Sequence, residues 1–121
     1  MNALVCAGVV LIGGCGSVLR FAVDGVIGAR LGRAFPFGTL VVNVSGAMIL
    51  GLVTGLALGE DGALLAGTAA VGSYTTFSTW MFETQRLTEE RQHRSAALNI
   101  VVSLVLGVGA AAVGRWIGTR A

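Results

Sequence analysis

Gly72-Ser-Tyr-Thr-Thr-Phe-Ser-Thr-Trp80 is the stretch of this sequence that decides its fold. It lies inside an uncharged apolar segment, residues 62–82, which is long enough to cross a lipid bilayer as a helix. Five of its nine residues are serine or threonine, and these residues together with glycine favour an interrupted helix. An interruption at membrane depth persists only where protein buries it or where it lines a cavity. The alternative is an intact helix whose hydroxyls bond back to carbonyls one turn earlier.

Three further apolar segments lie outside this stretch, at residues 4–26, 35–58 and 96–117. Hydrophobic residues make up 55% of the 121 residues and charged residues only 12%, which is about half the share usual in soluble domains. The connectors are short, so neighbouring helices must run antiparallel. The sequence therefore predicts an all-α protein of the cell membrane (plasma or inner). It forms a single domain, residues 1–121, with four transmembrane helices, the third interrupted near mid-membrane.

The charged residues and cysteines argue against several classes of protein. The eight basic residues are all arginine and form short clusters, with no basic stripe that would suit nucleic acid. His93 is the only histidine, no CxxC or other metal-binding spacing occurs, and no nucleophile–base pair is suggested, so we expect no enzyme. Cys6 and Cys15 lie nine residues apart in one apolar helix, about 13 Å by helical rise, too far for a disulfide. We expect both to be small buried side chains.

Glycines recur at helical spacing. Gly51, Gly55 and Gly59 form two overlapping GxxxG patterns in the second apolar segment, and Gly114 and Gly118 form another in the fourth. Small residues let helix backbones approach closely in lipid. We therefore expect tight helix packing at these positions.

Two polar residues interrupt the second apolar segment. Thr39 and Asn43 are four residues apart and so share one face of a helix. A carboxamide among Val and Ile residues is unfavourable in lipid unless it meets a partner or water. Asn43 therefore either forms an interhelical hydrogen bond or lines a polar path as a donor.

Phe77 and Trp80 are three residues apart in the decisive stretch and so face one way. The edge of an aromatic ring is positive, so ring edges can receive an anion where a basic side chain would be too polar. Simple packing is the alternative.

Arg20, at the end of the first apolar segment, either extends to the interface or supplies positive potential to a vestibule.

Three long motifs occur in order along the chain: Gly13-Gly-x-Gly-Ser-x-x-Arg20-Phe, Phe35-Pro-Phe-Gly-Thr-Leu-x-Val-Asn43-x-x-Gly46 and Gly72-x-x-Thr-Thr-Phe-Ser-Thr-x-x-x-Glu83. Together they resemble the CrcB/Fluc family of small fluoride channels, over essentially the whole chain. The resemblance implies an antiparallel, dual-topology dimer with two fluoride pores at its interface. It also implies passive export of cytoplasmic fluoride, which reduces fluoride toxicity.

The resemblance assigns roles to particular residues. Arg20 matches the motif arginine of the first helix and is a vestibule candidate. The implied fluoride pore contains a helix-two asparagine with a threonine nearby, two ring edges, two hydroxyls of the helix-three break and a helix-four serine, which correspond here to Asn43, Thr39, Phe77, Trp80, Ser78, Thr79 and Ser103.

A structural sodium ion on the dimer axis is also implied by the resemblance. Backbone carbonyls of the helix-three break would hold it, and Gly72 and Thr75 match the family pattern there.

Two positions depart from the family pattern. Trp80 stands where the family usually has its second phenylalanine, and Asn99 stands where many relatives carry tyrosine. The indole of Trp80 keeps a ring edge and adds an N–H donor, but it is bulkier. Either change can weaken one pore without altering the fold.

The arginines are distributed unequally between the two sides of the predicted bundle. Arg115 and Arg120 lie on the side of the termini, whereas the other side has five arginines, if the embedded Arg20 is left out: Arg30, Arg33, Arg86, Arg91 and Arg94. Positive residues favour the cytoplasm. The subunit is thus expected to prefer one orientation and to pair with an oppositely inserted relative, as an alternative to a homodimer.

Two other functions compete with fluoride conduction. A small multidrug-resistance-type, proton-coupled exporter would need an ionisable carboxylate deep in the membrane, whereas the acidic residues near the apolar segments lie close to their ends: Asp24, Glu60, Asp61 and Glu83. A membrane assembly factor without transport activity would leave the polar stretch at residues 72–80 unexplained. Passive conduction of fluoride is the function we expect.

Overall fold

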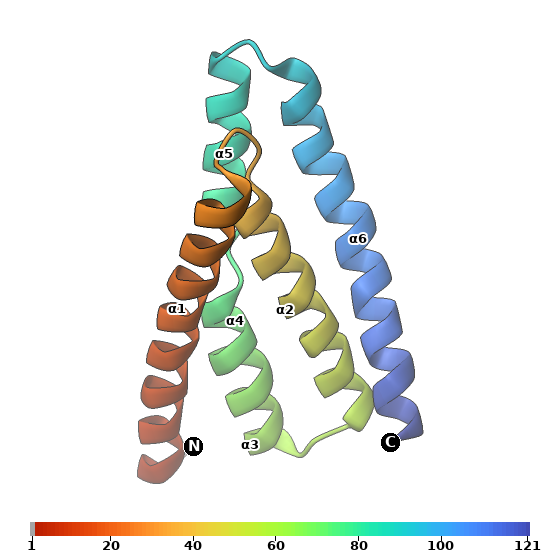
Figure 1. The fold of residues 1–121 in the computed structure, drawn as a ribbon. Helices are drawn as coiled ribbons and strands as arrows, with labels where there is room; N and C mark the ends of the chain where they lie inside the picture. The colour runs from red at the N-terminus through yellow and green to blue at the C-terminus, as the bar shows by residue number, and fades with distance from the viewer. Residues whose placement is uncertain (1) are drawn as a thin grey trace.

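The computed structural model describes residues 2–121, and this range is almost entirely helical (Figure 1). Three helices are long and apolar enough to cross a membrane: α1 (Ala3–Leu31), α2 (Phe37–Leu56) and α6 (His93–Arg120). Large apolar side chains cover the outside, and Leu4 and Phe21 of α1 are 82% and 80% exposed. Such a surface is stable in lipid and not in water, so the chain is a multi-pass membrane protein.

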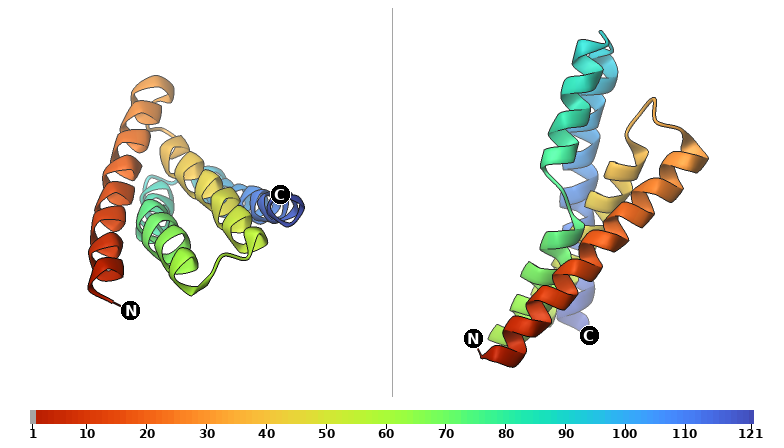
Figure 2. Two further views of the ribbon diagram at one scale, coloured as in Figure 1. Left: turned by 90° about the horizontal axis from the view of Figure 1, so that it is seen from below. Right: turned by 90° about the vertical axis from the view of Figure 1, so that its left-hand side faces the viewer.

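A fourth column of the fold is built from short pieces: α3 (Glu60–Ala63), the π-helix η1 (Leu64–Val71), α4 (Gly72–Tyr74) and α5 (Ser78–Glu89). The first three pieces are continuous. At Thr75 the backbone becomes extended, with φ −79° and ψ 160°, and a helix resumes at Ser78. The interruption expected between Gly72 and Thr79 therefore lies at residues 75–77. Figure 2 shows the extended segment joining the two helical parts.

Most of the helices extend beyond the apolar segments that predict them, whereas α2 (Phe37–Leu56) is shorter than its segment, residues 35–58. α1 continues to Leu31, α5 continues to Glu89, and α6 begins at His93. Apolar composition marks only the part of a helix that faces hydrocarbon, and polar residues extend the same helix beyond it. Gly32 follows the last residue of α1 with φ 79° and ψ −179°, a backbone conformation that is essentially confined to glycine.

Helices α2 and α6 pack backbone to backbone through the two glycine patterns. A Cβ atom on Gly51 would collide with the carbonyl oxygen of Ala111, and one on Gly114 would collide with that of Met48. Gly55 and Gly118 are similarly crowded by the facing helix. The expected tight packing is confirmed for these four glycines, and the GxxxG pattern of one helix lies against that of the other. It was wrong for Gly59, which lies beyond the end of α2 and where a Cβ atom would meet no heavy atom of residues 2–121 within 4 Å.

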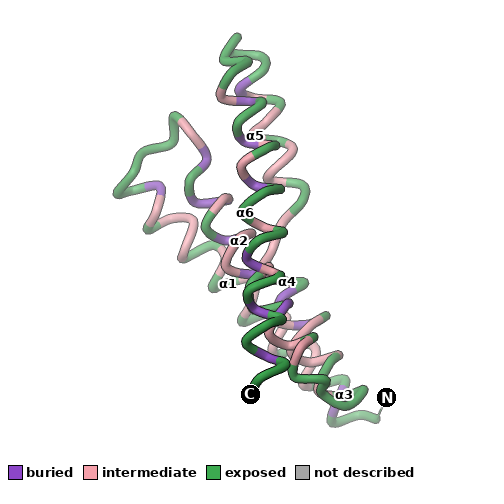
Figure 3. Tube along the Cα trace, turned by 90° about the vertical axis from the view of Figure 1, so that its right-hand side faces the viewer, coloured by how far each residue is buried: buried purple, intermediate pink, exposed green. Residues whose placement is uncertain are grey.

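Helix α1 packs against η1 and α4 on one side only. Gly16 makes the close contact there, because a Cβ atom would collide with the hydroxyl of Ser73. Cys6 and Cys15 are both exposed, so the expectation that they are buried was wrong. The cause is that a membrane helix can be apolar all round, and its composition does not tell which side faces protein. Figure 3 shows how few residues of the described helices are buried.

The N-terminal end of α1, the α2–α3 connector and the end of α6 lie at one end of the molecule (Figure 1). The α1–α2 and α5–α6 connectors lie toward the other end. This arrangement agrees with the two sides assigned to the arginines from the sequence.

Candidate functional site

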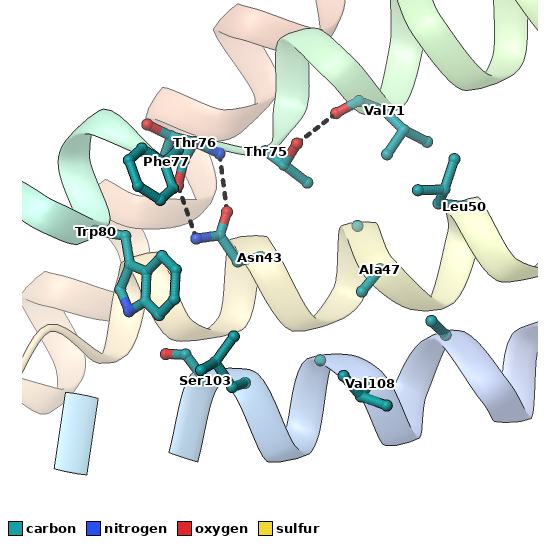
Figure 4. Close-up of a pocket in the computed structure, with 14 residues that line it drawn as sticks. Asn43, Ala47, Leu50, Val71, Thr75, Thr76, Phe77, Trp80, Ser103 and Val108 are labelled. Atoms are coloured by element: carbon teal, nitrogen blue, oxygen red, sulfur yellow. Dashed lines mark hydrogen bonds between the residues drawn. The ribbon is translucent and has the colours of Figure 1, made fainter. Parts of the chain in front are cut away.

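Asn43 of α2 holds the broken segment in place (Figure 4). Its Nδ2 donates to the carbonyl oxygen of Thr76 at 2.8 Å, and its Oδ1 accepts from the Thr76 N–H at 2.8 Å. The carboxamide thus takes the place of the two hydrogen-bond partners that a continuous helix would give to the N–H and the carbonyl of Thr76. Asn43 does form an interhelical hydrogen bond, one of the two roles open from the sequence.

The bond from Thr76 to Asn43 has a consequence for Gly72. In a continuous helix the Thr76 N–H would donate to the Gly72 carbonyl four residues earlier, but here it donates to Asn43. The hydroxyls of Ser73 and Thr75 do bond back to the carbonyls of Ala69 and Val71, at 2.6 and 2.9 Å. Back-bonding hydroxyls, the pattern expected of an intact helix, therefore occur together with the break.

An open groove of about 410 Å³ runs between α2, the break and α6 (Figure 4). Most of its lining is apolar, including Gly46, Leu50 and Val108. It brings together the following residues singled out from the sequence: Asn43, Thr75, Phe77, Trp80 and Ser103. These come from α2, the break, α5 and α6, so the groove exists only in the folded chain.

The two aromatic rings of the groove meet edge to face. The ring centroids of Phe77 and Trp80 are 5.8 Å apart, with an angle of 81° between the ring planes. Phe77 is 70% exposed. The indole nitrogen of Trp80 donates to the main-chain carbonyl of Asn99 at 3.0 Å. The extra donor that tryptophan brings to this position is therefore already engaged.

Asn99 lies behind Trp80, fully buried, and does not line the groove. Its Nδ2 donates to Thr84 Oγ1 at 2.9 Å and to the Trp80 carbonyl at 3.4 Å. Sequence reasoning singled out Asn99 and Trp80 separately but did not predict their contact or the hydrogen bond from Asn99 to Thr84. The spacing could have linked Thr84 to Trp80, since Thr84 follows Trp80 by four residues and so shares its helix face.

The buried hydroxyl of Ser103 faces the groove from α6. Within residues 2–121 neither Ser103 Oγ nor Asn99 Oδ1 has a hydrogen-bond partner. A hydroxyl can donate as well as accept. Ser103 therefore offers the groove wall a donor that the described side chains do not use.

Other expected pore residues lie apart from this groove. Thr39 and Thr79 line a much smaller cavity of about 30 Å³ near the α1–α2 connector, together with Asp24 and Glu83. Ser78 is exposed at the start of α5, and Arg20 is partly buried on α1. The structure of the single chain does not bring these four expected residues to the groove: Thr39, Ser78, Thr79 and Arg20.

Ion pairs gather at the connector end. Arg33 contacts Asp24 at 3.4 Å, and Arg86 contacts Glu83 at 2.8 Å and Glu90 at 3.0 Å. Arg86 also donates to the Arg33 carbonyl at 3.0 Å, which ties the α1–α2 connector to α5. The hydrogen bond with Glu83 raises the pKa of Arg86, so this guanidinium stays charged.

Comparisons with known proteins agree with the motifs. The family model described as CrcB-like protein, Camphor Resistance (CrcB), matches residues 7–115. A Mycobacterium tuberculosis protein named fluoride-specific ion channel FluC 2 is 66% identical over 110 residues, which cover 91% of this chain and 87% of that protein. A Leifsonia xyli protein named fluoride-specific ion channel FluC 1 is 44% identical over 122 residues, 98% of this chain and 89% of that protein. The chain therefore belongs to the CrcB family.

Proposed function

We propose that this protein is a passive fluoride-selective channel that exports fluoride from the cytoplasm. The observation that carries the proposal is the groove in which Asn43, Phe77 and Trp80 meet the broken helix, in a chain whose relatives are named fluoride-specific ion channels. Fluoride is small and holds its water tightly, so a path must offer replacement donors without fixing the ion.

The groove offers donors of the required weak kind. The Nδ2 of Asn43 carries two N–H groups, and the Thr76 carbonyl takes one, which leaves the other free of partners within residues 2–121. The Ser103 hydroxyl and the ring edges of Phe77 and Trp80 add to it. None of these groups is a cation, so an anion is attracted but not trapped.

A fourth membrane span completes the proposed channel. Three helices qualify as spans by themselves, and the fourth would be the column α3, η1, α4 and the first turns of α5. Each of its pieces is short, but the column runs alongside α1 and α2 (Figure 1). The satisfied hydrogen bonds at the break support the assignment, because irregular backbone in lipid needs partners.

An antiparallel dimer would complete the pores. The groove is open along one face, and Phe77 is 70% exposed at its edge, which leaves the ion path with only one wall in a single chain. A second copy inserted with the opposite orientation would supply the other wall. The homodimer is the simpler assembly. The unequal arginines favour instead a subunit active only with a related partner.

A structural sodium ion at the dimer interface is part of the proposal. The Gly72 carbonyl has lost its usual helical donor to Asn43, and Thr75 lies in the extended segment. Carbonyl oxygens are the ligands that hard cations prefer. The residues present fit such an ion, which would hold the two broken helices together by charge.

Fluoride efflux from liposomes that contain the purified chain tests the function. We expect fluoride flux well above that of empty liposomes, and no chloride flux under the same gradient. Absence of fluoride flux would defeat the homodimeric channel. Flux that appears only after a related subunit is added would favour the paired assembly.

A proton-coupled exporter remains the second candidate. It needs a carboxylate that takes up and releases protons within the membrane. Asp24 contacts Arg33 and Glu83 contacts Arg86, all near the connectors. We therefore expect Asp24→Asn and Glu83→Gln to leave fluoride flux within about twofold, because neither carboxylate lines the groove. Loss of transport in both variants would favour the exporter.

A further inference from the structure

Trp80 and Asn99 exchange two hydrogen bonds between α5 and α6. The indole N–H of Trp80 donates to the main-chain carbonyl of Asn99 at 3.0 Å, and the Asn99 carboxamide donates to the main-chain carbonyl of Trp80 at 3.4 Å. Each side chain thus donates a hydrogen bond to the main-chain carbonyl of the other residue. The Asn99 side chain therefore helps to hold its own main-chain carbonyl beside the indole of Trp80.

The Asn99 carboxamide has no proton left for an ion. Its Nδ2 carries two N–H groups, one directed to the Trp80 carbonyl and the other to Thr84 Oγ1. Thr84 donates its own hydroxyl proton to the Trp80 carbonyl at 2.9 Å, so its oxygen can only accept from Asn99. The two acceptors on α5 therefore require the Nδ2 end of the carboxamide, and not its Oδ1 end, to point at α5. The remaining Oδ1 is an acceptor, which repels anions.

The contact decides which part of the indole faces the groove. In Figure 4 the indole nitrogen points away from Asn43, and the six-membered ring lies nearer to it. An indole N–H is a much stronger donor than a ring C–H. With the N–H bound to Asn99, only the weak ring edge of Trp80 is left for the groove.

We propose that Asn99, supported by Thr84, is a positioning residue that withdraws the Trp80 N–H from the ion path and leaves the ring edge there. The proposal rests on the proposed fluoride channel and deepens it, because it names what keeps the ion loosely held. A free indole N–H in the groove would bind fluoride more firmly and slow its exit. Asn99 acts through Trp80 and does not touch the ion.

The test compares Asn99→Leu and Thr84→Val with the parent chain in liposomes, at several fluoride concentrations. Both variants keep the main-chain carbonyl that accepts from the indole, but they remove hydrogen bonds of the Asn99 side chain that hold α6 against α5 beside that carbonyl. We therefore expect the indole contact to loosen and the maximal flux to fall roughly three- to tenfold, the effect of one lost hydrogen bond. We also expect half-maximal flux at a lower fluoride concentration. A variant that merely folds poorly would lower the maximal flux alone, and that result would overturn the proposal.

Thr88→Val is the matched control. Thr88 lies one turn beyond Thr84, is exposed, and donates its hydroxyl proton back to the Thr84 carbonyl, so the same chemical change there should leave both flux parameters unchanged. Trp80→Phe supplies the second comparison. In that background Asn99→Leu should add less than twofold, because one shared contact has already been lost. Effects that multiply instead would show that Asn99 acts independently of Trp80.

Tryptophan fluorescence separates this proposal from the channel itself. The chain has two tryptophans, so Trp116→Phe leaves Trp80 as the sole reporter. Asn99→Leu in that background should lower the fluorescence anisotropy of Trp80, and Thr88→Val should not. Unchanged anisotropy would overturn the proposal. If the parent chain carries no fluoride, the proposed function fails and the role in the ion path falls with it, while the anisotropy still tests the contact.

Discussion

The carboxamide of Asn43 forms two 2.8 Å hydrogen bonds with the main chain of Thr76, one in each direction. These residues are 33 positions apart in the sequence, so a side chain of α2 holds the break at residues 75–77 in place. A side chain on an intact helix thereby supplies the hydrogen-bond donor and acceptor that the main chain lacks at the break. The same side chain lines the groove, so the support of the break and the proposed ion path depend on one residue.

Asn43→Asp should abolish most fluoride flux. A carboxylate still accepts from the Thr76 N–H, but it cannot donate to the Thr76 carbonyl, and its charge repels fluoride. The variant also loses the proposed donation from Nδ2 to fluoride, and a hydrogen bond to a charged group is worth about 1.5–3 kcal/mol, so we expect flux to fall roughly 10- to 100-fold. Flux of fluoride from liposomes measures the change.

Asn43→Leu separates repulsion from support. Leucine has a similar size and no charge, and it leaves both Thr76 groups without their partner. If Asn43 also contacts the ion, the aspartate variant should conduct less than the leucine variant. Equal flux in the two variants would mean that Asn43 only supports the break, and unchanged flux in both would remove it from the path.

Phe77→Leu tests the ring edge at the exposed side of the groove. Leucine keeps the apolar volume approximately but lacks the positive ring edge, whose interactions are worth about 0.5–1.5 kcal/mol, so flux should fall roughly two- to tenfold. Phe82→Leu is the control, because Phe82 lies on α5, is 65% exposed and does not line the groove. Equal losses in both variants would point to general packing and not to the ring edge.

Gly114→Ala should destabilise the contact between α2 and α6. The added Cβ atom would collide with the Met48 carbonyl, and overpacking of this kind costs about 1–3 kcal/mol. Gly109→Ala makes the same change on α6, where a Cβ atom would meet no heavy atom of residues 2–121 within 4 Å. Thermal unfolding in detergent should therefore show a lower midpoint for Gly114→Ala only. A similar drop for Gly109→Ala would mean that glycine content itself, and not the contact, matters.

Much of the fold could be predicted from the sequence because it depends on local chemistry. Apolar length predicts α1, α2 and α6, glycine spacing predicts close helix packing without naming the partner helix, and the hydroxyl-rich stretch predicts the interruption. A helix cannot continue smoothly where several residues offer their backbone other partners. The position of the break within three residues, 75–77, follows only from the bond to Asn43, which lies on another helix.

The partners across the fold could not be predicted. Trp80 and Asn99 both stood out as departures from a family pattern, but their mutual contact joins two helices and leaves no periodic signal. Thr39 shares a helix face with Asn43 but lines a different cavity, since the α1–α2 connector closes over one end of that face. Helical spacing tells which residues are neighbours along one helix, and tertiary packing decides what each of them meets.

The membrane orientation of the chain gives the last prediction. Five arginines lie on the side of the α1–α2 and α5–α6 connectors and two on the side of the termini, with Arg20 left out. Because positive residues favour the cytoplasm, reporters fused to the two termini in cells should lie mainly outside. Arg91→Gln with Arg94→Gln leaves three arginines against two and should shift the reporters toward a mixture. Arg115→Gln, on the other side, should strengthen the preference. An even mixture in the parent chain would show that one gene product inserts both ways, and no related partner would then be needed.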